Sequence, residues 1–212
     1  MKKLLTSIAF VSISICAMAQ SNYEKTMTSL VEQIEAVPVM QESYMPIANK
    51  MERVANAEAD KWEAAYWMSY MYTIESFLKP SSAEKDAVLD IAQGYLDKAE
   101  KLSPNNDEIE VMKAQLATAK LSVDPQNRYM TYGAKFNEAL EKAEKINPAN
   151  PRTHYLRGTT LFYTPEGFGG GKEKALAEFK VAMEKFDNFK PKTAYMPKWG
   201  KNETTYFITL CQ

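Results

Sequence analysis

The residues that could do chemistry are few and far apart in this chain. His154 is the only histidine among 212 residues, and Cys16 and Cys211 are the only cysteines. A catalytic histidine needs a nucleophile or an acid held at hydrogen-bond distance, and no diagnostic spacing surrounds His154. A zinc cluster or a disulfide framework needs more of both residue types. We therefore expect no metal site, no cofactor and no enzymatic activity, and a packing or capping role for His154.

The glycine-rich run over residues 167–172 was compared with phosphate-binding loops. Such a loop has the pattern Gly-x-x-x-x-Gly-Lys-Ser/Thr and follows a strand. Here Glu166 stands in place of the first glycine, Glu173 stands in place of the Ser or Thr, and no strand pattern precedes the run. We interpret the run as a tight turn between two helices, where glycine allows backbone angles that other residues avoid.

Composition and charge exclude several broad classes. The chain is 45% hydrophobic and 25% charged, which is typical of a globular fold and argues against intrinsic disorder. Its formal net charge of -1 argues against a nucleic-acid-binding protein, which normally shows an excess of basic residues. Neighbouring carboxylates, such as Glu108 with Glu110, fit solvated helix faces.

The first 19 residues have the features of a cleaved signal peptide. Lys2 and Lys3 precede an apolar run over residues 4–15, and Ala17-Met18-Ala19 matches the small-x-small pattern of signal peptidase. The run is shorter than the roughly 20 residues of a membrane-spanning helix. Ile15 is bulky where a lipidated Cys16 would need a small neighbour, which argues against a lipoprotein. We expect a periplasmic or secreted protein that begins at Gln20, with no transmembrane segment in the mature chain.

The mature chain, residues 20–212, is predicted to be all-α. Apolar residues recur at spacings of three and four, and no alternating strand pattern exceeds a few residues. Ser81 with Glu84 forms a capping box, and Asp124-Pro125 places a cap before a proline at the first helical position. The predicted helices after the first two cover about 60–77, 82–102, 107–121, 125–146, 151–163, 172–186 and 201–210.

A repeat is visible when the helices that end near prolines are aligned. The residues five, eight and twelve positions before Pro104 and Pro148 are small or apolar in both cases: Ala99, Leu96 and Ala92, and Ala143, Leu140 and Phe136. Ten residues beyond these prolines lie the small residues Ala114 and Gly158, where two helices would cross closely. Lys113 and Arg157 occupy the preceding position, where an apolar residue is usual.

These positions resemble the tetratricopeptide repeat (TPR), a helix–turn–helix unit. The resemblance implies a right-handed α-superhelix: a degenerate pair over 22–57, repeats over about 60–104, 105–148 and 149–187, and a capping helix over 197–212. The chain is also similar to secreted helical repeat proteins of Bacteroidota. The segments that carry this similarity include Val123-Asp124-Pro125, Phe168-Gly169-Gly170-Gly171 and Pro197-Lys198-Trp199-Gly200.

The resemblance implies that the first helix of each pair lines a concave binding face. We therefore expect a scaffold that binds an unknown protein or peptide there. The alternative is a small-ligand or glycan-binding accessory protein of the cell envelope, which the many aromatic residues favour. A further possibility is that the C-terminal helix fills this concave face, or that the lengthened turns at residues 79–82, 122–128 and 164–171 do so. The residues expected on the concave face are Tyr66, Tyr70, Val111, Gln115, Arg152, Tyr155, Thr159 and Phe162.

Overall fold

The computed structural model describes residues 22–38 and 41–212, and these residues contain helices but no strand. The predicted signal peptide and its cleavage site lie outside the described residues. The first helix spans residues 22–36. The later elements are α2 (Met45–Ala57), α3 (Trp62–Glu75), η1 (Ser76–Leu78), α4 (Ser82–Leu102), α5 (Asp107–Val123), α6 (Pro125–Ile146), α7 (Pro151–Tyr163), η2 (Glu166–Phe168), α8 (Lys172–Asn188) and α9 (Lys201–Cys211). The all-α prediction is confirmed.

Local capping chemistry sets where the helices begin. The side chains of Ser81, Asn106, Asp124 and Asn150 each accept a hydrogen bond from a backbone N–H in the first turn of α4, α5, α6 and α7. Such caps satisfy N–H groups that have no partner inside the helix. The starts of these four helices therefore agree with the starts that the sequence predicts.

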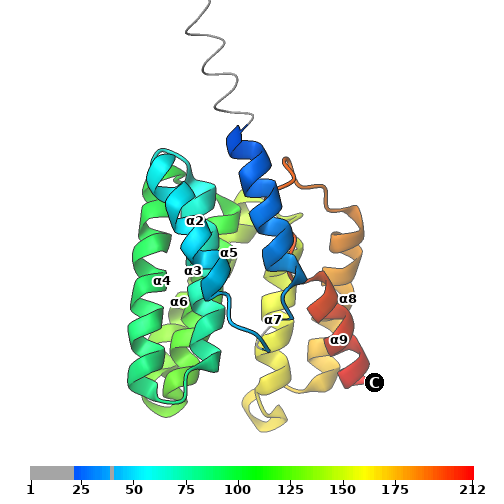
Figure 1. Ribbon diagram of the computed structural model, residues 1–212. Coiled ribbons are helices and arrows are strands. Elements are labelled where there is room, and N and C mark those ends of the chain that lie inside the picture. Colours follow the sequence, from blue (N-terminus) through cyan, green and yellow to red (C-terminus); the bar gives the residue numbers. More distant parts are fainter. Residues whose placement is uncertain (1–21, 39–40) are drawn as a thin grey trace, which may run out of the picture.

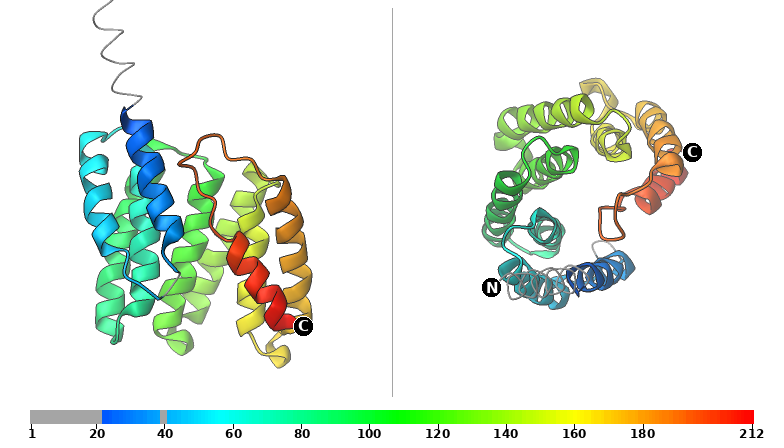
Figure 2. Two further views of the ribbon diagram at one scale, coloured as in Figure 1. Left: turned by 45° about the vertical axis from the view of Figure 1, so that its right-hand side comes forward. Right: turned by 90° about the horizontal axis from the view of Figure 1, so that it is seen from above.

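The helices form a curved array of antiparallel pairs (Figure 1). The strongest packing is between α3 and α4, α5 and α6, and α7 and α8, and α5 also packs against α3 and α7. Seen from above, α3, α5 and α7 lie on the inner side of the curve, and α4, α6 and α8 lie on the outer side (Figure 2). Every pair therefore offers one inner and one outer helix to its surroundings.

The crossing of α7 and α8 depends on Gly158. A Cβ atom at this position would lie 2.6 Å from Cε1 of the buried Phe179 ring. The small residue expected at the crossing is therefore required by the close approach of the two helices. In the nearby turn, Gly169 and Gly171 adopt φ angles of 91° and 111°, which confirms that the glycine run serves as a tight turn.

None of the helices in the described residues is both long enough and apolar enough to cross a membrane.

Candidate functional site

A non-helical stretch between α8 and α9, residues 189–200, covers the inner side of the array (Figure 2). We call it the closing segment. Its Trp199 side chain donates a hydrogen bond from Nε1 to the Tyr66 hydroxyl at 2.9 Å. Trp67 of α3 donates from Nε1 to the Tyr195 carbonyl at 2.8 Å. Both bonds are buried, so Tyr195 and Trp199 join the closing segment to the core.

The closing segment also reaches the beginning of the described chain. The Tyr195 ring meets the Tyr23 ring edge to face, with 5.7 Å between the ring centroids. The Lys198 ammonium lies 3.3 Å from the Glu35 carboxylate. The first helix and the last segments are therefore in contact across the inner side.

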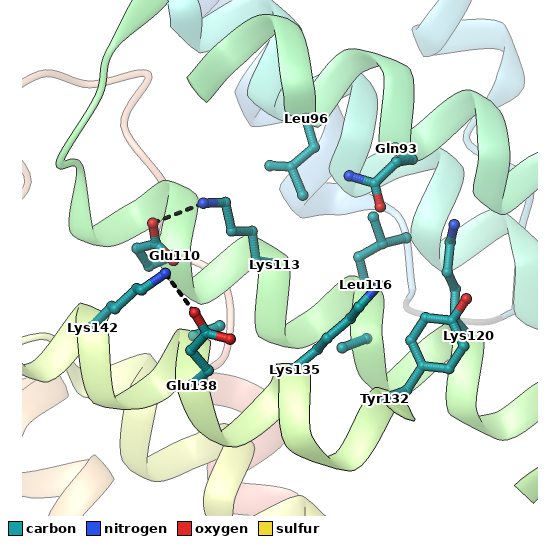
Figure 3. Close-up of a pocket in the computed structure, with 12 residues that line it drawn as sticks. Gln93, Leu96, Glu110, Lys113, Leu116, Lys120, Tyr132, Lys135, Glu138 and Lys142 are labelled. Atoms are coloured by element: carbon teal, nitrogen blue, oxygen red, sulfur yellow. Dashed lines mark hydrogen bonds and ion pairs between the residues drawn. The ribbon is translucent and has the colours of Figure 1, made fainter. Parts of the chain in front are cut away.

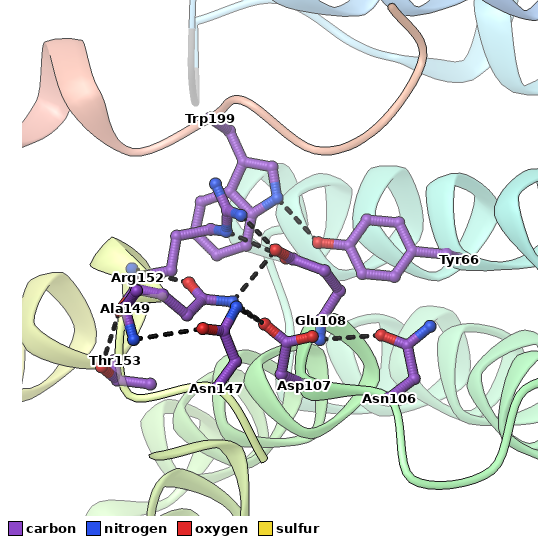
Figure 4. A network of polar contacts seen from close by, with 10 residues as sticks. Tyr66, Asn106, Asp107, Glu108, Asn147, Ala149, Arg152, Thr153 and Trp199 are labelled. Carbon is purple, nitrogen blue, oxygen red and sulfur yellow. Dashed lines mark hydrogen bonds and ion pairs between the residues drawn. The ribbon is translucent and has the colours of Figure 1, made fainter. Parts of the chain in front are cut away.

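A buried ion pair joins α5 to α7 beneath the closing segment (Figure 4). Arg152 is fully buried and bonds Glu108 through both Nε and Nη2, with the Nε bond at 3.0 Å. Asn150 donates a further hydrogen bond to Glu108 at 3.0 Å. The guanidinium carbon lies 4.7 Å from the centroid of the Phe189 ring and 5.6 Å from that of Trp199. Burial raises the pKa of Glu108 above its usual value, and Arg152 opposes that shift. The expectation that Glu108 and Glu110 lie on solvated helix faces is wrong: both are buried, because Glu108 pairs with Arg152 and Glu110 with Lys113.

The predicted concave residues are therefore largely covered. Four of them are buried, with relative exposures of at most 4%: Tyr66, Tyr70, Val111 and Arg152. The other four are half-buried: Gln115, Tyr155, Thr159 and Phe162. The expected exposure of the first four is corrected: Trp199 of the closing segment contacts Tyr66, Tyr70 and Arg152, and Val111 is buried in the same core cluster. A binding role for the set stays a prediction.

A hollow on the outer side remains open (Figure 3). It lies over α5, between α4 and α6, and has a volume of about 240 Å³. We call it the outer groove. Its apolar lining comes from all three helices: Leu96 of α4, Leu116 and Ala117 of α5, and Ala139 of α6. The remaining lining residues are polar or charged: Gln93, Glu110, Lys113, Lys120, Tyr132, Lys135, Glu138 and Lys142.

One ion pair links α4 to α6 near the outer groove. Arg128 donates to both oxygens of Asp86, at 2.6 and 2.7 Å. This contact lowers the pKa of Asp86 below its ordinary value. The spacing in the sequence would also allow Arg128 to pair with Asp124, four residues earlier, but Arg128 pairs with Asp86. Asp124 instead accepts hydrogen bonds from the backbone and side chain of Asn127, as a helix cap.

A second exposed surface lies where α7 and α9 meet. The Phe207 ring contacts the rings of Tyr163 and Tyr206, with centroid separations of 6.0 and 5.9 Å. These two tyrosines are 73% and 61% exposed. In this aromatic patch, formed by Tyr163, Tyr206 and Phe207, the two tyrosines project into solvent around the buried Phe207 ring, and none of the three lines the outer groove. It is therefore a weaker candidate than the outer groove for enclosing a small ligand.

The only histidine lies away from both surfaces. His154 Nδ1 is 2.7 Å from a carboxylate oxygen of Glu178, which joins α7 to α8. In the described part of the chain, no group of three or more His, Cys, Asp or Glu residues is placed to hold a metal ion.

The outer groove was not predicted from the sequence. One available signal was Lys113, a charged residue at a repeat position that is usually apolar. Lys120 lies seven residues further along α5, and Lys135 and Lys142 have the same separation on α6. A spacing of seven places two residues on one helix face. Two such lysine pairs on consecutive helices therefore predict a basic strip, although they do not predict the hollow beside it.

The fold was compared with known proteins. No family model matches the chain, and no curated protein matches it significantly. Among solved structures, it is similar to the HusA haemophore from Porphyromonas gingivalis. The two share 35% sequence identity and superpose with a TM-score of 0.78, over 90% of this chain and 92% of that chain. Identity at this level over nearly both whole chains shows a family relationship, and this chain belongs to the family of the HusA haemophore.

Proposed function

We propose that this protein is an exported, non-catalytic carrier that binds haem or a related tetrapyrrole in the outer groove. The observation that carries the proposal is the 35% identity to a haemophore over nearly the whole chain. Of the two functions considered from the sequence, the small-ligand alternative therefore has more support than the protein-binding scaffold. The covered inner side also weighs against a scaffold that binds there.

The chemistry of the outer groove suits an amphipathic ligand. Haem is a flat apolar macrocycle that carries two carboxylate side chains. Leu96, Leu116 and Ala139 form a largely buried apolar floor, with at most 4% of each residue exposed. Four lysines and two glutamates surround this floor. The volume is below the roughly 300–1,000 Å³ of pockets that enclose a drug-sized ligand. The macrocycle would therefore insert one edge and leave the opposite edge in solvent.

Recognition would rest on the ring and its carboxylates. Histidine is a common axial ligand of haem iron, but His154 lies on α7 against Glu178 and does not line the groove. Tyr132 places a half-buried aromatic ring at one wall, where it can contact the macrocycle.

The proposal includes a TPR-like superhelix and export of the mature chain. The recurring positions in α4, α6 and α8 support a TPR-like superhelix. The signal-peptide pattern supports export and a mature start at Gln20. Mass spectrometry of the exported protein tests the second: an N-terminal lipid on Cys16, or retention of residues 1–19, would contradict it.

A titration of the mature chain with haem, followed by absorbance, tests the proposal. We expect saturable binding with one site. Gln93→Trp places a bulky ring at the rim of the groove and should weaken binding at least several-fold without lowering the melting temperature. Tyr206→Ser on the aromatic patch is the matched control and should bind as the wild type does. Absence of saturable binding contradicts the proposal. Loss of binding in Tyr206→Ser alone would move the site to the aromatic patch.

A further inference from the structure

The two ends of the outer groove differ in charge (Figure 3). At one end, every lysine is held by carboxylates. Lys113 lies 2.6 Å from Glu100 and 2.8 Å from Glu110, and Lys142 lies 2.8 Å from Glu138. We call this the paired end. A ligand carboxylate arriving there must compete with these short contacts.

At the other end, the lysines are more available. Lys135 has no carboxylate contact within the described residues, and its ammonium lies 5.2 Å from the centroid of the Tyr132 ring. Figure 3 shows its side chain reaching toward the side of the groove where Lys120 and Tyr132 lie. Lys120 makes one longer contact, 3.3 Å to Asp90, whose side chain is 77% exposed. We call this the cationic end.

The other polar and charged groups near the cationic end do not change the difference in lysine pairing between the two ends. Arg128 is occupied by both oxygens of Asp86 and by the Lys120 carbonyl. Gln93 donates to Asp97 on its own helix and carries no charge. Lys135 is therefore the cation that gains most from a new anionic partner, because it gives up no ion pair to make one.

Resting on the proposed function, we infer that the groove binds its tetrapyrrole in one orientation and selects ligands with free carboxylates. The carboxylate edge lies at Lys135 and Lys120, and the apolar edge lies toward the paired end. At Lys135, a charge-assisted hydrogen bond forms without loss of an existing ion pair, and at Lys120 it competes only with the longer contact to the exposed Asp90. In the reverse orientation, the ligand carboxylates would displace Glu110 or Glu138.

The experiment measures dissociation constants of the mature chain for haem and for haem dimethyl ester, which lacks both negative charges. The wild type should bind the free acid more tightly than the ester. Lys135→Gln should weaken binding of the free acid by roughly three- to tenfold, allowing for its exposure to solvent. The same variant should leave binding of the ester unchanged. Lys120→Gln should have the same direction of effect and a smaller size.

Lys142→Gln makes the same change on the same helix at the paired end, and it should weaken binding of the free acid less than Lys135→Gln does. Lys145→Gln is the matched control, because Lys145 is exposed on the same helix and does not line the groove; it should leave the free-acid affinity unchanged. Lys135→Arg keeps the charge and should retain the preference for the free acid. The inference is overturned if Lys142→Gln weakens binding as much as Lys135→Gln, or if the wild type binds acid and ester equally. Failure of the wild type to bind either ligand would instead contradict the proposed function itself.

Discussion

The inner side of the array and the outer groove both combine apolar surface with charged side chains, but they use the charges differently. On the inner side, Arg152 and Glu108 are buried and pair with each other beneath Trp199. In the outer groove, Lys135 faces solvent without a carboxylate partner in the described chain. A buried charge needs a partner because its desolvation costs free energy, whereas a cation in water costs little when it has no partner. Arg152 thus stabilises the fold, and Lys135 is the better candidate for binding an anionic ligand.

High pH should have the largest effect on the fold, because it ionises tyrosines that are buried in the core. Burial raises the pKa of Tyr44 to about 12 and raises those of Tyr66, Tyr70 and Tyr155 further. The unfolded chain releases these protons from about pH 10, so their stabilisation is complete below pH 10 and is lost as the pH rises through 12. We expect the fold to be lost between these values, as followed by circular dichroism and tyrosinate absorbance. Tyr44→Phe should move the midpoint upward; an unchanged fold above pH 12 would contradict the prediction.

Removal of Arg152 should cause the largest loss among single substitutions. Arg152→Ala leaves Glu108 buried without its cation, which typically costs about 3–5 kcal/mol. Urea unfolding should show this loss. Haem binding by the folded fraction should be unchanged, because the outer groove is not altered. Arg157→Ala is the control on the same helix, since Arg157 pairs with Glu144 at a half-exposed position. A loss for Arg152→Ala no larger than that of the control would mean that the inner side tolerates an unpaired carboxylate.

The crossing of α7 and α8 should tolerate no added side chain. Gly158→Leu should cost roughly 1–3 kcal/mol, because even its Cβ overlaps the Phe179 ring. Thermal melts measure the effect, with Gly94→Leu as the control, because a Cβ atom at Gly94 would meet no neighbouring atom within 4 Å. A melting temperature for Gly158→Leu that equals or exceeds the wild-type value would show that close packing against Phe179 does not require glycine at this position.

The smallest effect is expected at the ion pair beside the groove. Asp86→Asn should lower stability by about 1 kcal/mol or less, since both partners are partly exposed. It also frees Arg128 near the cationic end, so affinity for haem should hold or increase. A clear decrease in affinity would show instead that Asp86 shapes the groove.

Local signals explain why the helices could be predicted from the sequence. Prolines and capping residues act within a few positions, so the bounds of α6 and α7 agree with the prediction at both ends. The closing segment has no helical period, and its Tyr195 and Trp199 contact residues more than 120 positions away. Nothing local indicates where such a segment docks.

The sequence contains a signal for the buried ion pair between Glu108 and Arg152. Glu108 and Arg152 are 44 residues apart, the same separation as the repeat prolines Pro104 and Pro148, and they carry opposite charges. Equivalent positions of adjacent repeats lie side by side, so this pairing could have been inferred. The outer groove could not, because its depth depends on the spacing of α4 and α6 rather than on any one residue.

The contact between the closing segment and the first helix has a consequence for how the molecule comes apart. Linear repeat arrays commonly unfold from their ends, because each unit touches only its neighbours. Here Tyr195 contacts Tyr23 and Lys198 contacts Glu35, at sequence separations of at least 163 residues. The terminal units thus support each other, and fraying at either end exposes the core at the other. The array should behave as one cooperative unit, and its folding is complete only once the C-terminal residues are present.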